Sequence, residues 1–263
     1  MSNANEALLS ARRRVAEAAA REAGKLALDR FRNRRFTVEA KGTQDFVSEV
    51  DKETEKLIRE RLGAVFPEDG FIGEETGGTP ERIVWVVDPI DGTHNFVRGI
   101  GFWCVSIGLV VDGKPSVGVI YDPIQDELYS AAAGQGATLN GEAIKVSATT
   151  EPTEAVVAIG SNFRKPPELH VNTIATLFEE RCSHRGQGAG ALSLALVSAG
   201  RLDGYFENHI NSWDVMAGIV LIAEAGGYVN DFMADNGLME GNTIFACAPG
   251  LKGFLSKATG FDC

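Results

Sequence analysis

The chain has 263 residues, enough for one large core or two fused halves, and its 44% hydrophobic and 23% charged residues are typical of a soluble globular protein. A formal net charge of −11 argues against general binding to nucleic acid or to an anionic membrane. The first residues lack the profile of a secretory signal, and no run of about 18 apolar residues occurs. We therefore expect a cytoplasmic location.

Two helices are predicted first. Apolar positions recur at helical spacing from Ala4 to about Phe31, which predicts a long amphipathic helix that packs on a core. The segment Ser48 to Asp51 fits a capping box, and the apolar pattern after it continues until just before Pro67. The capping box gives Asp51 a structural explanation.

Acidic residues follow the next predicted strand. Phe71 to Gly73 predicts a short strand that ends at Glu74 and Glu75. Taken alone, this pair is typical of a solvated acidic turn. A second strand close by in the sequence also ends in acids, which suggests a common site.

That second strand carries the clearest chemistry. An apolar, β-branched run from Ile83 to Val87 predicts a buried strand that ends at Asp88. We expect Pro89 to stop the strand, because proline has no N–H for the ladder. Asp91 follows in a turn, so both carboxylates can face one point at the carboxyl end of the strand, where open α/β sheets bind ligands.

The residues after Asp91 predict a tight turn and a helix start. Gly92 permits the tight backbone, and Thr93 is a suitable cap for a helix that starts at His94 or Asn95. The free N–H groups of such a helix start can bind an anion. Carboxylates beside an anion site make sense if a divalent cation lies between them. The alternative is an Asp-rich turn that caps a helix.

The rest of the chain changes pattern near residue 150. Strand-like runs with Asp-Gly and Asp-Pro turn signals predict an antiparallel meander within residues 102–132. From residue 155 strands alternate with helices, which predicts a partly parallel sheet. We therefore predict an N-terminal half, 1–150, with an antiparallel sheet and most of the metal ligands, and a C-terminal half, 151–263, with Asp214 and the substrate-side residues.

Asp214 comes directly before an apolar segment, Val215 to Ala223, that predicts a buried helix. As the N-cap of this helix, Asp214 has a purely structural explanation. An N-cap at the mouth of a sheet can also be a ligand, so its position alone leaves both functions open.

Together these segments resemble the inositol monophosphatase family, which belongs to the lithium-sensitive, magnesium-dependent phosphatases. The signature W-x-x-D-P-I/L-D-G-T-x-N-F is matched by Trp85 to Phe96, and a second signature, W-D followed by E-A-G-G, by Trp213 to Gly227. Gly73 to Glu75 matches the G-E-E element, and Asp45 to Asp51 matches D-x-V-[ST]-x-x-D. The resemblance covers nearly the whole chain. It implies a mixed α+β protein with a layered α-β-α-β-α sandwich of the fructose-1,6-bisphosphatase/inositol monophosphatase type, and a homodimer.

The resemblance also implies the roles of the acids. The implied ligands of one Mg²⁺ are Glu74, Asp88 and the backbone carbonyl of Ile90, and those of a second are Asp88, Asp91 and Asp214. Thr93 and Glu74 would orient the attacking water with Asp51 in support, and Lys41 lies on a loop associated with a third, weaker metal. Mg²⁺ prefers such hard oxygen ligands, and phosphoryl transfer depends mainly on positioning and charge neutralisation.

Substrate contacts follow from the same resemblance. The phosphate is expected on the two metals and on the backbone N–H groups of Gly92 and Thr93, next to Asp91. The polyol is expected beside Glu207 and the segment Gly188-Ala189-Gly190-Ala191. Ala189 replaces a hydroxyl residue of the family pattern and Gly190 replaces alanine, while Arg98 and Gly101 are further departures. Inositol 1-phosphate is the first candidate substrate; histidinol phosphate, fructose 1,6-bisphosphate and a 3′-phosphonucleotide are alternatives.

The sequence bears on two other functions. A haloacid-dehalogenase-type phosphatase needs D-x-D-x-T, whereas two residues separate Asp88 from Asp91. A regulatory protein that binds a partner such as the transcription machinery, as some bacterial relatives do, stays open, although the complete set of acids favours catalysis. The expected partner is a small phosphorylated polyol or sugar, with no nucleic acid and no membrane.

Overall fold

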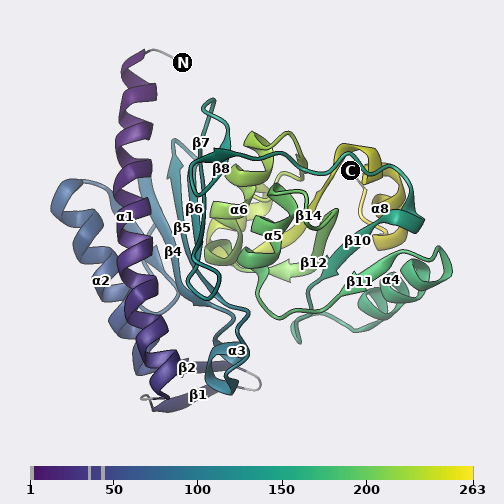
Figure 1. Cartoon of the computed structure of the whole chain (residues 1–263), viewed down its shortest axis with the longest axis horizontal. Coiled ribbons are helices and arrows are strands. Elements are labelled where there is room, and N and C mark those ends of the chain that lie inside the picture. Colours follow the sequence, from purple (N-terminus) through teal and green to yellow (C-terminus); the bar gives the residue numbers. More distant parts are fainter. Residues whose placement is uncertain (1–2, 35–36, 43–44, 263) are drawn as a thin grey trace.

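The computed structural model describes residues 3–34, 37–42 and 45–262, and its helices and sheets form alternating layers (Figure 1). Helices α1 (Asn3–Asn33) and α2 (Glu49–Val65) cover one face of a seven-stranded sheet. Helices α5 (Gly190–Ser198) and α6 (Ser212–Glu224) separate this sheet from a five-stranded one. Helices α4 (Glu168–Glu179) and α8 (Lys252–Thr259) pack on the far face of the second sheet. This order of layers is the α-β-α-β-α sandwich that the sequence implies.

The seven-stranded sheet contains the predicted meander. Its strands, in spatial order, are β3 (Gly70–Gly73), β4 (Ile83–Asp91), β5 (Cys104–Val111), β6 (Lys114–Asp122), β7 (Glu127–Ala132), β8 (Ala137–Leu139) and β9 (Glu142–Ala143). Strand β3 runs parallel to β4, and each later neighbour is antiparallel to the one before it. Asp112 and Gly113 turn the chain between β5 and β6 with φ of 49° and 74°, a conformation that aspartate tolerates and glycine favours.

The N-terminal helix lies close to this sheet because its buried face is built of small side chains. Ala16, Ala20, Ala23 and Ala27 are all fully buried. At Gly24 a Cβ atom would overlap the ring of Tyr121 on β6. The predicted amphipathic helix is therefore confirmed, with alanine and glycine rather than large apolar residues at the closest approach.

The five-stranded sheet is partly parallel, as predicted. Its order is β11 (Ser183–Arg185), β10 (Val156–Ile159), β12 (Gly204–Ile210), β14 (Asn242–Cys247) and β13 (Tyr228–Val229). Strand β10 is parallel to both β11 and β12, whereas β14 is antiparallel to its two neighbours. The sequence pattern did not predict β14 or α8.

Shorter elements complete the described chain. They are the hairpin of β1 (Val38–Gly42) and β2 (Asp45–Ser48), helices α3 (Thr93–Arg98) and α7 (Gly237–Glu240), and the 3₁₀ helices η1 (Pro152–Glu154), η2 (Ala234–Asn236) and η3 (Pro249–Leu251). No helix in the described ranges is both long enough and apolar enough to cross a membrane.

Helix α6 is apolar on nearly all sides because it lies between the two sheets (Figure 1). Where it crosses the seven-stranded sheet, two glycines face it. A Cβ atom on Gly108 would lie 2.6 Å from the Met216 Cβ, and one on Gly118 would overlap the Ala217 carbonyl oxygen. Because Gly108 and Gly118 have no side chains, α6, which carries Asp214, can approach β5 and β6 this closely.

We expect Gly118→Ala to destabilise the protein by about 1–3 kcal/mol, because the added methyl group must push α6 away from β6. Urea unfolding monitored by circular dichroism measures this change. Gly63→Ala on α2 is the matched control, since a Cβ there meets no atom within 4 Å. The control should be neutral or stabilising by up to about 1 kcal/mol. Equal midpoints for the two variants would contradict the close approach of α6.

Candidate metal centre and active site

Three carboxylates from distant parts of the chain meet at one point. Asp88 and Asp91 belong to the end of β4, and Asp214 belongs to the first turn of α6. A carboxylate oxygen of each lies within 4.8 Å of the others. Asp88 and Asp91 are only 2% and 5% exposed. The structure thus brings together the three acids that the sequence predicts as one ligand set.

The strand that carries two of these acids does not stop at Pro89, so that prediction is wrong. Strand β4 continues to Asp91, and its pairing with β5 shifts between Asp88, opposite Ser106, and Asp91, opposite Cys104. Proline is tolerated because this irregular stretch needs no N–H from it. In a regular strand, residues three apart point to opposite faces, so the bulge is what lets both carboxylates face the same point.

Backbone N–H groups at the start of α5 hold Asp91 in place. Its Oδ1 accepts a hydrogen bond from the Gly190 N–H at 3.0 Å, and its Oδ2 accepts one from the Leu192 N–H at 3.1 Å. The Cys104 thiol donates to the same Oδ2 at 3.6 Å. The main chain of α5, in the neighbouring helical layer, therefore fixes the orientation of the Asp91 carboxylate.

Asp214 is held by the start of its own helix. Helix α6 begins at Ser212 with Asn211 as its N-cap, and Asp214 accepts a hydrogen bond from the Asn211 N–H at 3.2 Å as part of a capping box. The prediction that Asp214 itself is the N-cap is wrong, because Asn211 supplies the cap and Asp214 occupies the third helical position. The capping box therefore holds the Asp214 carboxylate at the N-terminal end of α6.

The close acids perturb one another strongly. Burial raises the pKa of Asp88 well above its ordinary value, and the charges of Glu74, Asp214 and Asp91 raise it further. Burial raises the pKa of Asp91 to about 6, against the opposing effect of its backbone hydrogen bonds. Burial and the charge of Asp91 raise the pKa of Asp214 to about 8. A multiply charged cation bound among them would relieve this repulsion, and the all-oxygen donor set fits a hard ion such as Mg²⁺.

Glu74 lies beside this group without being one of its three members. It is partly buried in the turn after β3, where its N–H donates to the Val87 carbonyl oxygen at 3.1 Å. Its charge is the largest electrostatic contribution to the raised pKa of Asp88. Among the neighbouring charges, that of Glu74 therefore acts most strongly on Asp88.

Thr93 connects the acidic turn to α2. Its hydroxyl lies 3.1 Å from Asp51 Oδ1 and 2.9 Å from the Ile90 carbonyl oxygen, so its single proton can be donated to either. Asp51 is fully buried on α2. Thr93 is the first residue of α3 rather than its cap, so that prediction is wrong: the N-cap is Gly92, which makes no side-chain cap bond.

Gly92 is required by its backbone and by its surroundings. Its φ of 91° lies in the left-handed region, which disfavours residues with a side chain. A Cβ atom there would lie 3.0 Å from the Ala189 Cβ and 3.1 Å from the Phe102 carbonyl oxygen. The close approach of Gly92 and Ala189 joins the acidic turn to the segment predicted to bind substrate.

A pocket of about 370 Å³ opens next to the acids. Asp91, Asp214 and Glu207 all line it. Gly160, Gly188, Ala189, Gly190 and Tyr205 also line it. Glu207 and three residues of the segment predicted to lie beside the polyol, Gly188, Ala189 and Gly190, therefore line the same pocket as two predicted metal ligands, whereas Ala191 does not.

Tyr205 is a member of this pocket that sequence reasoning missed. It is buried on β12, and its hydroxyl donates to Glu207 Oε2 at 2.7 Å. A Cβ atom on Gly160 would overlap this pair, so the glycine leaves the space that the two side chains occupy. Burial raises the pKa of Glu207 to about 7 even with hydrogen bonds from Tyr205 and Asn162. The signal in the sequence was that Tyr205 and Glu207 are two residues apart, which puts both side chains on one face of the strand.

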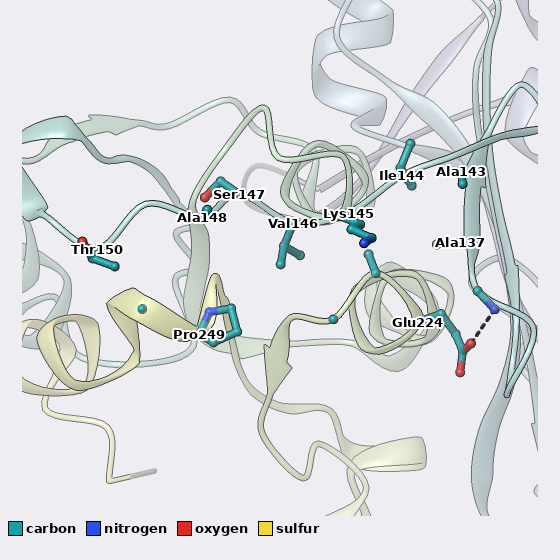
Figure 2. Close-up of a pocket in the computed structure, with 14 residues that line it drawn as sticks. Ala137, Ala143, Ile144, Lys145, Val146, Ser147, Ala148, Thr150, Glu224 and Pro249 are labelled. Carbon is teal, nitrogen blue, oxygen red and sulfur yellow. Dashed lines mark hydrogen bonds between the residues drawn. The ribbon is translucent and has the colours of Figure 1, made fainter.

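A separate hollow of about 630 Å³ lies against the C-terminal end of α6 (Figure 2). Lys145, Val146 and Pro249 line it, and so does Glu224, whose carboxylate accepts hydrogen bonds at 2.8 Å from the Gly134 and Gly136 N–H groups. Glu224 is therefore engaged in holding the loop before β8. None of the predicted site residues lines this hollow.

Two predicted features lie outside what the structure describes. The side chains of Lys41, on the loop assigned to a third metal, and of Asp45, in the D-x-V-[ST]-x-x-D element, are not among the described ones. Of that element the structure describes the side chain of Asp51, which meets Thr93.

Comparison with known proteins gives a consistent result. The model of the inositol monophosphatase family matches residues 8–259. Nus factor SuhB of Escherichia coli (strain K12) is 38% identical over 242 residues, which are 89% of this chain and 90% of the relative. Among solved structures, the extragenic suppressor protein suhB of Bartonella henselae is 35% identical with a TM-score of 0.88, over 95% of this chain and 98% of that one. The inositol monophosphatase of Anabaena is 34% identical with a TM-score of 0.83, over 95% of each chain. These structures confirm the predicted fold.

Proposed function

Because this chain belongs to the inositol monophosphatase family, we propose that it is a Mg²⁺-dependent phosphomonoesterase acting on a small polyol or sugar phosphate, with inositol 1-phosphate as the first candidate. The observation that carries the proposal is the group formed by Asp88, Asp91 and Asp214, of which Asp91 and Asp214 line a polar pocket. Such a group can hold a cation against a phosphate, and the pocket has room for the alcohol part of the ester.

The cations would be held by oxygen atoms on both sides of Asp88. Glu74, Asp88 and the Ile90 carbonyl would hold one, and Asp88, Asp91 and Asp214 would hold the other. When bound, such ions supply charge neutralisation for the phosphoryl group and lower the pKa of water. Asp88 Oδ1 also accepts a hydrogen bond from the Ile90 N–H at 2.9 Å, which orients the shared carboxylate.

Thr93 would orient the attacking water. When its hydroxyl donates to Asp51, the Thr93 oxygen is free to accept a hydrogen bond from a water molecule on the side of Glu74 and Asp88. Asp51 is buried and fixed on α2, so the threonine is held in one orientation before substrate arrives. The backbone N–H groups of Gly92 and Thr93 would bind phosphate oxygens.

The alcohol part of the ester would lie toward Gly188, Ala189, Gly190 and Glu207. Since Ala189 brings no hydroxyl, Glu207 is the acceptor most suited to the substrate hydroxyls in this part of the pocket. The segment Gly188 to Gly190 would leave main-chain groups facing the substrate.

We expect Glu207→Gln to raise KM for a polyol phosphate about 10-fold and to change KM for 4-nitrophenyl phosphate, which has no neighbouring hydroxyls, by less than about 3-fold. An acceptor that carries charge is worth roughly 1.5–3 kcal/mol in a buried hydrogen bond. Glu127→Gln is the matched control, because Glu127 also accepts a tyrosine hydroxyl two residues away, at 2.6 Å from Tyr129, but lies on β7 outside the pocket. Equal effects on both substrates would remove Glu207 from the polyol site.

Phosphate release tests the proposed function directly. The panel is inositol 1-phosphate, histidinol phosphate, fructose 1,6-bisphosphate and a 3′-phosphonucleotide, each with Mg²⁺, with EDTA, and with Mg²⁺ plus Li⁺. Release that requires Mg²⁺ and is inhibited by Li⁺ supports the proposal. No release from any ester at Mg²⁺ concentrations that stabilise the protein would contradict it. Sedimentation of the same sample tests the homodimer expected from the family.

A regulatory binding role is the second candidate, because the similar protein of Escherichia coli is called a Nus factor. The two roles separate experimentally. A panel without turnover, together with a saturable complex formed with a bacterial transcription factor, would favour the regulatory role. A catalytically inactive variant that still forms this complex would show both roles in one chain.

A further inference from the structure

A second buried acid lies on α2, one helical turn after Asp51. Glu55 is 1% exposed, although it is not one of the three clustered aspartates and the sequence pattern gave it no function. Residues four apart lie on the same face of a helix, so Asp51 and Glu55 both point from α2 into the protein. Asp51 contacts Thr93, and Glu55 reaches the turn that carries Glu74.

Both carboxylate oxygens of Glu55 bind this turn. Oε2 accepts a hydrogen bond from the Glu75 N–H at 2.9 Å, and Oε1 accepts one from the Thr76 hydroxyl at 2.5 Å. These partners are the two residues that follow Glu74. Gly73, the residue before Glu74, has room for the carboxylate only because it lacks a side chain: a Cβ there would overlap Glu55. Glu55 therefore contacts the chain on both sides of Glu74.

Strand β4 and Arg59 also hold the turn that carries Glu74. The Glu74 N–H donates to the Val87 carbonyl oxygen at 3.1 Å, directly before Asp88. Arg59, one turn after Glu55, donates to the Thr76 hydroxyl oxygen and lies over the ring of Phe71, 4.2 Å from its centroid. With β4 and α2 on either side, the backbone of Glu74 has little freedom.

We propose that Glu55 is a positioning residue that fixes the turn of Glu74 and thereby sets the cation affinity of the site. The inference rests on the proposed function, in which Glu74 is a cation ligand. Helix α2 would then orient two groups of the site. Glu55 would orient Glu74, the cation ligand, and Asp51 would orient Thr93, which holds the water. Glu55 itself touches neither cation nor substrate.

The test measures cation binding and catalysis separately. Mn²⁺ binding to the whole protein is measured by calorimetry without substrate, and the Mg²⁺ dependence of phosphate release is measured for wild type, Glu55→Gln and Glu55→Ala. Loss of groups that orient metal ligands typically weakens metal affinity about 10–100-fold. We expect Glu55→Ala to weaken Mn²⁺ binding by about 10-fold or more and to raise the Mg²⁺ concentration for half-maximal activity equally. Glu55→Gln keeps an acceptor for the Glu75 N–H, so its Mn²⁺ affinity should lie between those of wild type and Glu55→Ala.

At saturating Mg²⁺ the kcat of Glu55→Gln should recover to within about 3-fold of wild type, which a merely destabilised protein would not show. Thr76→Val removes one hydroxyl donor and gives a milder form of the same defect if Glu55→Ala does not fold. Glu60→Gln, on the exposed face of the same helix, is the control and should bind Mn²⁺ as wild type does.

The possible failures are distinguishable. Wild-type Mn²⁺ affinity in folded Glu55→Ala, or in both Glu55→Gln and Thr76→Val, would overturn the role of Glu55 and leave the proposed function standing. A wild-type protein that binds no Mn²⁺ and releases no phosphate would overturn the proposed function and this inference together.

Discussion

Replacing Asp91 by asparagine is expected to lower kcat/KM for phosphate release by about 100- to 1,000-fold and to leave the protein folded. The variant removes one negative charge from the proposed ligands of a cation, and preorganised electrostatic groups of this kind are worth about 10²–10³ in rate for a single donor. An asparagine oxygen can still accept one of the two backbone hydrogen bonds from Gly190 and Leu192. The cost in stability should therefore be only about 1–3 kcal/mol.

Initial rates over a range of Mg²⁺ concentrations, together with far-ultraviolet circular dichroism, measure these effects. Asp122→Asn is the matched control. Asp122 is also a buried aspartate, 5% exposed, that accepts two backbone hydrogen bonds, from Ile124 at 2.8 Å and Gln125 at 3.2 Å. It is not one of the clustered acids, so its variant should retain activity within about 3-fold. Mg²⁺-dependent turnover near the wild-type rate in Asp91→Asn would refute the assignment of Asp91.

Without divalent cations, the thermal stability of the protein should fall as the pH rises, and Mg²⁺ should oppose this fall. The pKa of Asp91 is raised to about 6 and that of Asp214 to about 8, whereas an unfolded aspartate has a pKa of about 4. Raised carboxyl pKa values favour the folded state while the groups are protonated, so this contribution is complete below about pH 4 and is lost as the pH rises through about 6 to 8. In EDTA the Tm should therefore drop over this range.

Bound Mg²⁺ reverses the effect because it favours the ionised carboxylates. At about 100 times its Kd a ligand contributes about 2.7 kcal/mol, which for a chain of this size raises Tm by about 5–10 °C. Differential scanning fluorimetry at about pH 5 and pH 8.5, with EDTA or Mg²⁺ at equal ionic strength, makes the comparison. Asp214→Asn should reduce both the pH dependence in EDTA and the Mg²⁺ shift. A Tm that Mg²⁺ leaves unchanged at pH 8.5 would argue against a cation site.

The regular elements were predictable because their sequence signals are local. The alternation of strands and turn residues gave the meander from β5 to β7, and apolar periodicity gave α1 and α6. What the sequence could not give was the bulge at Pro89 in β4, since a bulge is fixed by pairing with Cys104 and Ser106 on the neighbouring strand. The division of the chain near residue 150 stays a prediction.

The acidic residues of the site could be predicted from the sequence, whereas the residues that support them were largely missed. The family motifs predict Asp88, Asp91 and Asp214 as one ligand set, and the structure brings these carboxylates together. Glu55 was missed because its importance comes from a contact across layers, with the turn after β3. Tyr205 was missed because its importance comes from a side-chain contact with Glu207 on the same strand. Helical spacing from Asp51 and strand spacing from Glu207 were the signals available.

The two glycines beneath α6 have a consequence beyond packing. Asp214 lies in the first turn of a helix whose distance from the sheet is set by Gly108 and Gly118, while Asp88 and Asp91 belong to the same sheet as those glycines. Any interior substitution that lifts the helix would widen the gap between the proposed ligands and change the size of ion that the proposed site prefers. Selectivity between Mg²⁺ and a larger ion such as Ca²⁺ could thus evolve in the apolar interior while every acid stays the same.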